Sequence, residues 1–78
     1  MILNNARRSK LREVLNILTG AESVVEQVCD KETDCLDNYP ENLQSTDKFE
    51  RMEDAVDSLN DALEKIGEAK EHIQYAIG

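Results

Sequence analysis

The chain has 78 residues, enough for one small domain with little interior, and its formal net charge at pH 7 is -8. Aromatic residues make up 4% of it, charged residues 33%, and it contains three Gly and one Pro. This composition is typical of long helices and excludes a sheet sandwich, which needs more β-branched and aromatic residues and more turns.

No segment of the sequence predicts export or membrane insertion. The first ten residues, MILNNARRSK, lack the apolar run of a signal peptide. No stretch approaches the roughly 18 consecutive apolar residues that a membrane-spanning helix needs. We therefore expect a cytoplasmic protein with no membrane partner.

Charge is divided unevenly along the chain. Residues 1–12 hold four bases, Arg7, Arg8, Lys10 and Arg12, and no acid, whereas residues 13–78 hold all 17 acids and the remaining five bases. A basic cluster at the start of a helix opposes the helix dipole, so we expect this basic head to have an acidic partner in the fold. Direct binding to nucleic acid is disfavoured, because the head lacks interleaved aromatic residues and the acidic body repels phosphate.

Residues 5 to about 36 predict a first helix, with Asn4 or Asn5 as its N-cap. Gly20 costs a helix interior about 1 kcal/mol relative to Ala, but the apolar heptad passes through it without a phase shift and favours one continuous helix. The core-facing positions are predicted to be Leu11, Leu18 and Val25 in one row, which Glu32 interrupts, and Val14, Ala21, Val28 and Cys35 in the other.

Further apolar residues flank this stripe and make it wider than one partner helix can cover. We expect them to be exposed on a lone hairpin and covered when two hairpins form a four-helix bundle. The predicted dimer interface consists of Leu15, Ile17, Val24, Cys29 and Leu36. A different protein docked on the same flank is an alternative.

The two cysteines, Cys29 and Cys35, are six residues apart, which is roughly 9 Å along a helix and too far for an intrachain disulfide. They form no C-x-x-C motif, and no further Cys or His cluster completes a zinc site. We expect both to be buried, reduced thiols.

Residues from about 37 to 46 predict a corner. The twelve residues DKETDCLDNYPE, 30–41, place acids as a calcium-binding loop does, but Cys35 stands where that loop needs glycine. Tyr39 precedes a proline and is pushed out of helical conformation, Pro40 can begin a short helical turn, and Leu43 is expected to close the end of the core. We therefore predict a hairpin corner and no metal site.

A second helix is predicted from about 47 to 77, with Ser45, Thr46 or Asp47 as its N-cap; Asp47 and Glu50 resemble a capping box. Its core positions are Phe49, Val56, Leu63 and Ile77 in one row, which Lys70 interrupts, and Met52, Leu59, Ile66 and Ile73 in the other. Ala55, Ala62, Ala69 and Ala76 directly precede successive members of the first row, and such small residues let a neighbouring helix come close.

The two helices together predict an all-α fold, an antiparallel, coiled-coil-like hairpin that forms one domain over residues 1–78. The predicted register pairs Leu18 with Ile66 and Cys35 with Phe49. It also brings the basic head, through Arg7, Arg8 and Arg12, beside Glu68 and Glu71.

One face of the second helix carries a row of carboxylates at alternating four- and three-residue spacing. This acidic stripe consists of Glu50, Asp54, Asp57, Asp61, Glu64, Glu68 and Glu71. It can keep the protein soluble as a solvated face, or it can imitate the phosphates of nucleic acid and occupy the basic groove of another protein.

The segments DNYPENLQST and FERMEDAVDSLNDALEKI resemble small helical proteins of unknown function that are encoded by bacteria and their phages or mobile elements. Those proteins share an N-x-P-E-N-L-Q corner followed by an acidic, alanine-spaced helix. The match covers the second half of the chain. The resemblance implies the hairpin shape and brings no activity with it.

No pattern in the sequence predicts catalysis. His72 is the one histidine, and Ala69 stands three residues before it, so the E-x-x-H motif of di-iron bundles is missing. The pattern also lacks a glycine-rich phosphate loop, a nucleophile near a base and a buried acid pair. We predict a non-enzymatic oligomerisation or protein-interaction module without cofactors, with an acidic nucleic-acid mimic that inhibits a DNA- or RNA-binding protein as the alternative.

Overall fold

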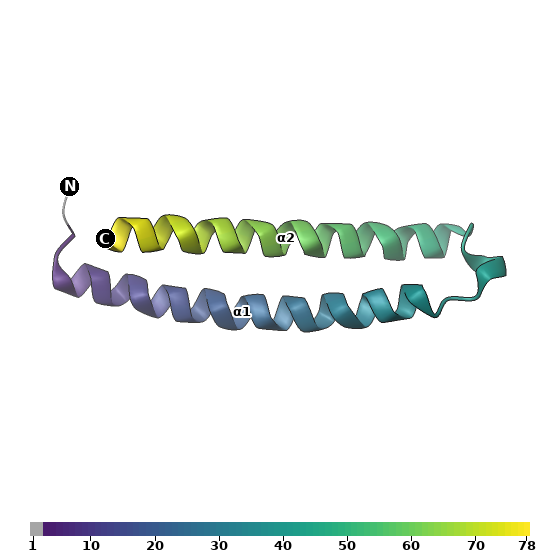
Figure 1. The fold of residues 1–78 in the computed structure, drawn as a ribbon, viewed down its shortest axis with the longest axis horizontal. Helices are drawn as coiled ribbons and strands as arrows, with labels where there is room; N and C mark the ends of the chain where they lie inside the picture. The colour runs from purple at the N-terminus through teal and green to yellow at the C-terminus, as the bar shows by residue number, and fades with distance from the viewer. Residues whose placement is uncertain (1–2) are drawn as a thin grey trace.

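The computed structural model describes residues 3–78 and shows two long helices that run antiparallel and side by side (Figure 1). Helix α1 spans Asn5–Asp37, a short 3-10 turn η1 spans Glu41–Leu43, and α2 spans Asp47–Ile77. The Cα atoms extend over 59 × 18 × 13 Å. The predicted all-α hairpin is confirmed, and within residues 3–78 no strand is present.

Both helices begin at a residue whose side chain caps them. The Asn4 Oδ1 accepts a hydrogen bond from the backbone N–H of Arg7 at 2.9 Å. Of the three candidates for the second cap, Thr46 is used: its Oγ1 accepts from the Phe49 N–H at 3.4 Å and donates to the Leu43 carbonyl at 2.7 Å. Such caps satisfy backbone donors that the first helical turn leaves unpaired. Helix α1 continues through Gly20 without a break.

The corner is built from short backbone turns. The Tyr39 N–H donates to the Leu36 carbonyl at 3.1 Å, and the Pro40 carbonyl accepts from the Leu43 N–H at 2.9 Å, so the proline opens η1. Residues 30–37 belong to α1, which leaves no calcium-type loop. Leu43 is 41% exposed and does not close the core as predicted. Instead the Tyr39 and Phe49 rings meet with centroids 5.2 Å apart and close that end.

The seam between the helices differs from the predicted seam in one of its two α1 rows, which is displaced by one residue along the helix. Cys29 and Val56 are its most buried members, at 5% and 8% exposure. The α1 residues of the seam are Leu11, Leu15, Leu18, Glu22, Val25, Cys29, Glu32 and Leu36, and the α2 residues are Phe49, Met52, Val56, Leu59, Leu63, Ile66, Lys70, Ile73 and Ile77, all buried or half-buried. On α1 the predicted row Val14, Ala21, Val28 and Cys35 is exposed. The phase that forms encloses Leu15 and Leu36, which are larger than the small or β-branched side chains it leaves outside.

The register is shifted by about one helical turn from the predicted one. Tyr39, four residues beyond the predicted Cys35, stacks on Phe49. In the middle of the seam, the Cys29 Sγ donates to the Asn60 Oδ1 at 3.5 Å. The shift arises because α1 continues to Asp37 and the corner draws Tyr39 into the end of the core.

Candidate interaction surface

Helix α1 carries a second apolar stripe that does not face α2. Val14, Ile17, Val24 and Val28 are 38%, 69%, 59% and 46% exposed. Ala21 is also exposed and completes the alternation of three and four residues, and Cys35, exposed as well, follows Val28 by seven residues with Lys31 between them. This stripe has the spacing of a helix-packing surface, and no helix of the hairpin covers it.

The predicted interface residues divide between the two stripes. Ile17 and Val24 lie on the exposed stripe. Leu15, Cys29 and Leu36 lie in the seam between α1 and α2, where Cys29 is buried and the two leucines are half-buried, and not on the exposed flank where the sequence pattern places them. Both thiols are free, but only Cys29 is buried, and the expectation of a buried Cys35 is wrong.

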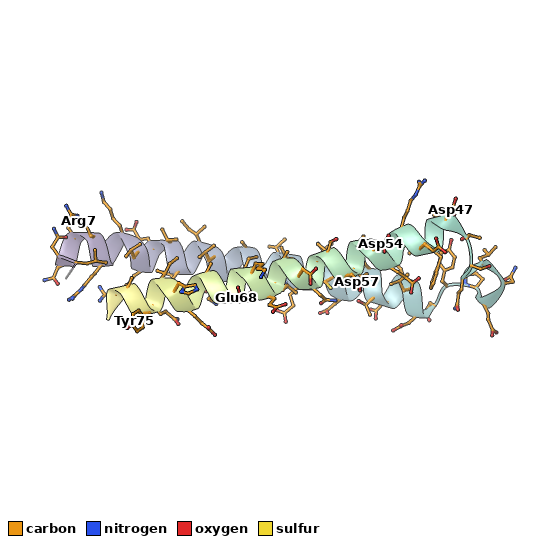
Figure 2. The ribbon with its side chains drawn as sticks, turned by 90° about the horizontal axis from the view of Figure 1, so that it is seen from above. Arg7, Asp47, Asp54, Asp57, Glu68 and Tyr75 are labelled. Carbon is orange, nitrogen blue, oxygen red and sulfur yellow. The ribbon has the colours of Figure 1, made fainter. Side chains whose placement is uncertain are left out.

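The alanines of α2 extend the exposed stripe across the hairpin. Each of them directly precedes a seam residue, as Val14, Ala21, Val28 and Cys35 do on α1. In an antiparallel pair, equivalent flanking positions of the two helices lie on the same side. We call this side the outer apolar face, and it consists of Val14, Ile17, Ala21, Val24, Val28 and Cys35 on α1 and Ala55, Ala62, Ala69 and Ala76 on α2. Figure 2 displays the hairpin with all described side chains.

Carboxylates are absent from this face, although the chain has 17 acids. The remaining residues on its helical positions are basic or neutral, namely Arg7, Lys10 and Lys31 on α1 and Lys48, Arg51, Ser58, Lys65 and His72 on α2. The acids are therefore confined to the rest of the surface. The outer apolar face therefore combines a row of apolar side chains with bases, and its charge is opposite in sign to that of the rest of the surface.

Among the described residues, the seam contains one ion pair, which joins Glu22, one of the two acids in the α1 rows, to Lys70, which interrupts a row of α2. The Lys70 Nζ lies 3.0 Å from the Glu22 Oε1, with side chains 21% and 29% exposed. A charged group in a largely apolar seam is costly without its partner, so each of these residues accounts for the presence of the other.

The basic head is not paired as predicted. Over residues 3–78 the ion pairs are Glu22–Lys70 and the exposed pair Lys65–Glu68, at 3.6 Å. The one-turn shift in register moves the head past Glu68 and Glu71, and the Arg8 Nε is buried without a hydrogen-bond partner. Beside the head, a groove of about 330 Å³ is lined by Leu3, Arg7, Lys10, Leu11 and Val14 and opens at the end of the outer apolar face.

The acidic stripe is exposed along its whole length. Figure 2 shows three of its members, Asp54, Asp57 and Glu68, spread along α2. At 3.5 residues per carboxylate, the stripe carries one charge per about 5 Å of helix axis. One strand of B-DNA carries one per about 3.4 Å, so the stripe is a more dilute row of charge than the phosphates it was predicted to imitate.

The described residues place no reactive cluster on the hairpin. Within residues 3–78, no group of three or more His, Cys, Asp or Glu side chains is arranged to hold a metal ion. His72 and Tyr75 are exposed on α2. None of the described helices combines the length and apolar character that crossing a membrane requires. Comparison of the chain with protein families, curated proteins and solved structures found no match.

Proposed function

We propose that this chain is a non-catalytic, cytoplasmic oligomerisation module whose outer apolar face packs against a second copy to form a four-helix bundle. The observation that carries the proposal is the exposure of Val14, Ile17, Val24 and Val28 in one line along α1. Large apolar side chains are found singly on most protein surfaces, but a contiguous row of them marks an interaction site.

The small interior of the hairpin supports the same proposal. Among residues 3–78, the buried apolar side chains are Cys29 and Val56 alone. A chain of this size rarely gains enough from a single core to offset the entropy of ordering its backbone, and association is one of the usual remedies. Covering the outer apolar face supplies the missing burial.

Val24→Glu tests this function, because Val24 lies near the middle of the exposed row. The glutamate would have to leave water when the second copy docks, so we expect the dimer to weaken at least ~100-fold and the chain to elute as a monomer at micromolar concentration. Light scattering after gel filtration measures the mass. Gln27→Glu adds the same charge at an exposed position outside the face and should leave the mass unchanged. A Val24→Glu chain that keeps the dimer mass contradicts the proposed interface.

An acidic competitor of nucleic acid is the second candidate, favoured by the exposure of all seven carboxylates of the acidic stripe, none of which lies on the outer apolar face. Neutralising Asp57, Asp61 and Glu64 to their amides should abolish capture of nucleic-acid-binding proteins from a lysate of the native host, with helicity unchanged. The matched control neutralises Glu26, Asp30 and Asp34 on α1, which changes the net charge equally. Equal capture by the two variants, measured by mass spectrometry, removes this candidate.

A further inference from the structure

We infer that the two copies pack head to tail, with a two-fold axis that crosses α1 midway between Ala21 and Val24 and α2 midway between Ala62 and Ala69. The inference rests on the proposed oligomerisation and adds its geometry. The axis runs across the hairpin, from α1 to α2, so that each helix lies antiparallel on its own counterpart in the second copy.

The charge of the hairpin favours this orientation. The corner end, residues 30–54, holds nine acids and three bases, whereas the head end, residues 3–12 and 68–78, holds five bases and two acids. Each hairpin is therefore an elongated dipole. Head-to-tail packing brings the net-positive head of one copy beside the net-negative corner of the other. The attraction comes from the corner carboxylates that border the outer apolar face, since the corner residues on the face itself, Lys31, Lys48 and Arg51, are basic.

The opposite arrangement, with the two-fold axis along the length of the hairpin, brings like charges together. It would set the two corner ends side by side, each with nine acids and three bases, and the two basic heads side by side. Like charges held close across an interface repel, which disfavours this arrangement.

The central part of the exposed row on α1 matches itself about the proposed axis. The axis pairs Ala21 of one copy with Val24 of the other and Ile17 with Val28, and further from the centre it pairs Val14 with Lys31 and Lys10 with Cys35. Antiparallel coiled helices pack in such layers, where the three-residue and four-residue steps of the two chains alternate. A small side chain meets a larger one at the centre of the contact.

The alanines on α2 give the same axis independently. Their midpoint lies between Ala62 and Ala69, so the axis pairs Ala62 with Ala69 and Ala55 with Ala76 of the second copy. Small side chains at these four positions let the two α2 helices approach closely. One two-fold axis therefore has to pair both the exposed row of α1 and the alanines of α2 with their copies.

The register of the hairpin places the midpoint of the α1 row and the midpoint of the α2 alanines at the same position along the helix axes. Tyr39 and Phe49 are in contact, and equal steps from that contact along the two antiparallel helices bring Ser23 level with Lys65. Ser23 lies at the midpoint of the α1 row and Lys65 at the midpoint of the alanines. The groove beside Lys10 and Val14 then receives the Cys35 end of α1 from the second copy.

A cysteine at residue 10 tests the geometry, because the native Cys35 is its predicted neighbour in the second copy. We expect Lys10→Cys to form a disulfide-linked dimer on mild oxidation and a thioether-linked dimer on treatment with a short bis-maleimide. Peptide mapping should show residue 10 joined to residue 35 in both. Within one chain the two thiols are 25 residues apart on α1, roughly 38 Å, so only an interchain link is possible.

Two controls complete the experiment. Ser9→Cys places the new thiol one residue earlier, off the outer apolar face. It should form at least ~10-fold less cross-link to Cys35 of the second copy than Lys10→Cys does, since the Cβ of residue 9 points away from the second copy. Adding Cys35→Ser to Lys10→Cys should abolish the link. If light scattering shows a dimer but residue 10 does not link to Cys35, the head-to-tail geometry is overturned while the proposed function stands. A monomeric wild-type chain overturns both.

Discussion

A chain with Val56→Asp is expected to lose most of its helical signal at room temperature. Val56 is one of the two buried apolar residues of the described hairpin and lies in the seam against α1. An aspartate there either carries an unpaired charge away from water or forces the helices apart, at a cost of about 3–5 kcal/mol. A domain of this size holds only a few kcal/mol in total, so the substitution removes most of its stability. Far-UV circular dichroism, followed through a thermal melt, measures the loss.

Gln74→Asp is the matched control for this substitution. It introduces the same residue with the same low helix propensity at an exposed position of α2. Its cost should stay below about 1 kcal/mol, because no seam contact is removed. Similar melting curves for the two variants would show that Val56 is not part of the core.

Replacing Lys70 by Met is expected to lower the free energy of unfolding, and replacing both Lys70 and Glu22 by apolar residues is expected to raise it. The single change leaves the Glu22 carboxylate in the seam without its cation, at a cost of about 1–2 kcal/mol for these partly exposed side chains. The double change, Glu22→Leu with Lys70→Met, fills the seam with apolar side chains and should stabilise the hairpin by about 1–3 kcal/mol. Urea unfolding measures both.

The exposed Lys48 provides the control, since Lys48→Met removes a charge from α2 outside the seam and should change stability by less than about 0.5 kcal/mol. Equal stabilities of the single and double variants would contradict the assignment of a coupled pair. The gain expected from the double variant implies that the native pair is kept for another reason than stability. A polar pair in an apolar seam fixes the register of two helices, because any slip separates its members.

The elements of the fold were predictable from local chemistry. One proline in a cluster of turn residues separates two long apolar heptads, and Asn4 and Thr46 each stand before a helix as its cap. These features act over a few residues and leave a clear trace in the sequence. The prediction of two helices in an antiparallel hairpin is therefore confirmed.

The phase and register of the seam were not predictable from periodicity alone. Helix α1 has two adjacent apolar stripes with the same spacing, and the predicted seam mixes residues of both. One feature of the sequence selects between the two stripes. Glu22 and Lys70 each interrupt an apolar row, and requiring them to meet selects the phase that includes Leu15 and Cys29. The same choice assigns Val14 and Val28, with Ile17 and Val24, to the outside of the hairpin.

The position of the chain ends would make the proposed pair a spacer of fixed length. Helix α1 begins and α2 finishes at the same tip of a rod 59 Å long, and the corner occupies the other tip (Figure 1). In the pair inferred above, proteins fused to the termini of the two copies lie at opposite ends of the bundle and are separated by its length. A heptad inserted into both helices would lengthen the bundle by roughly 10 Å, so the distance between two fused proteins could be set by the number of inserted residues.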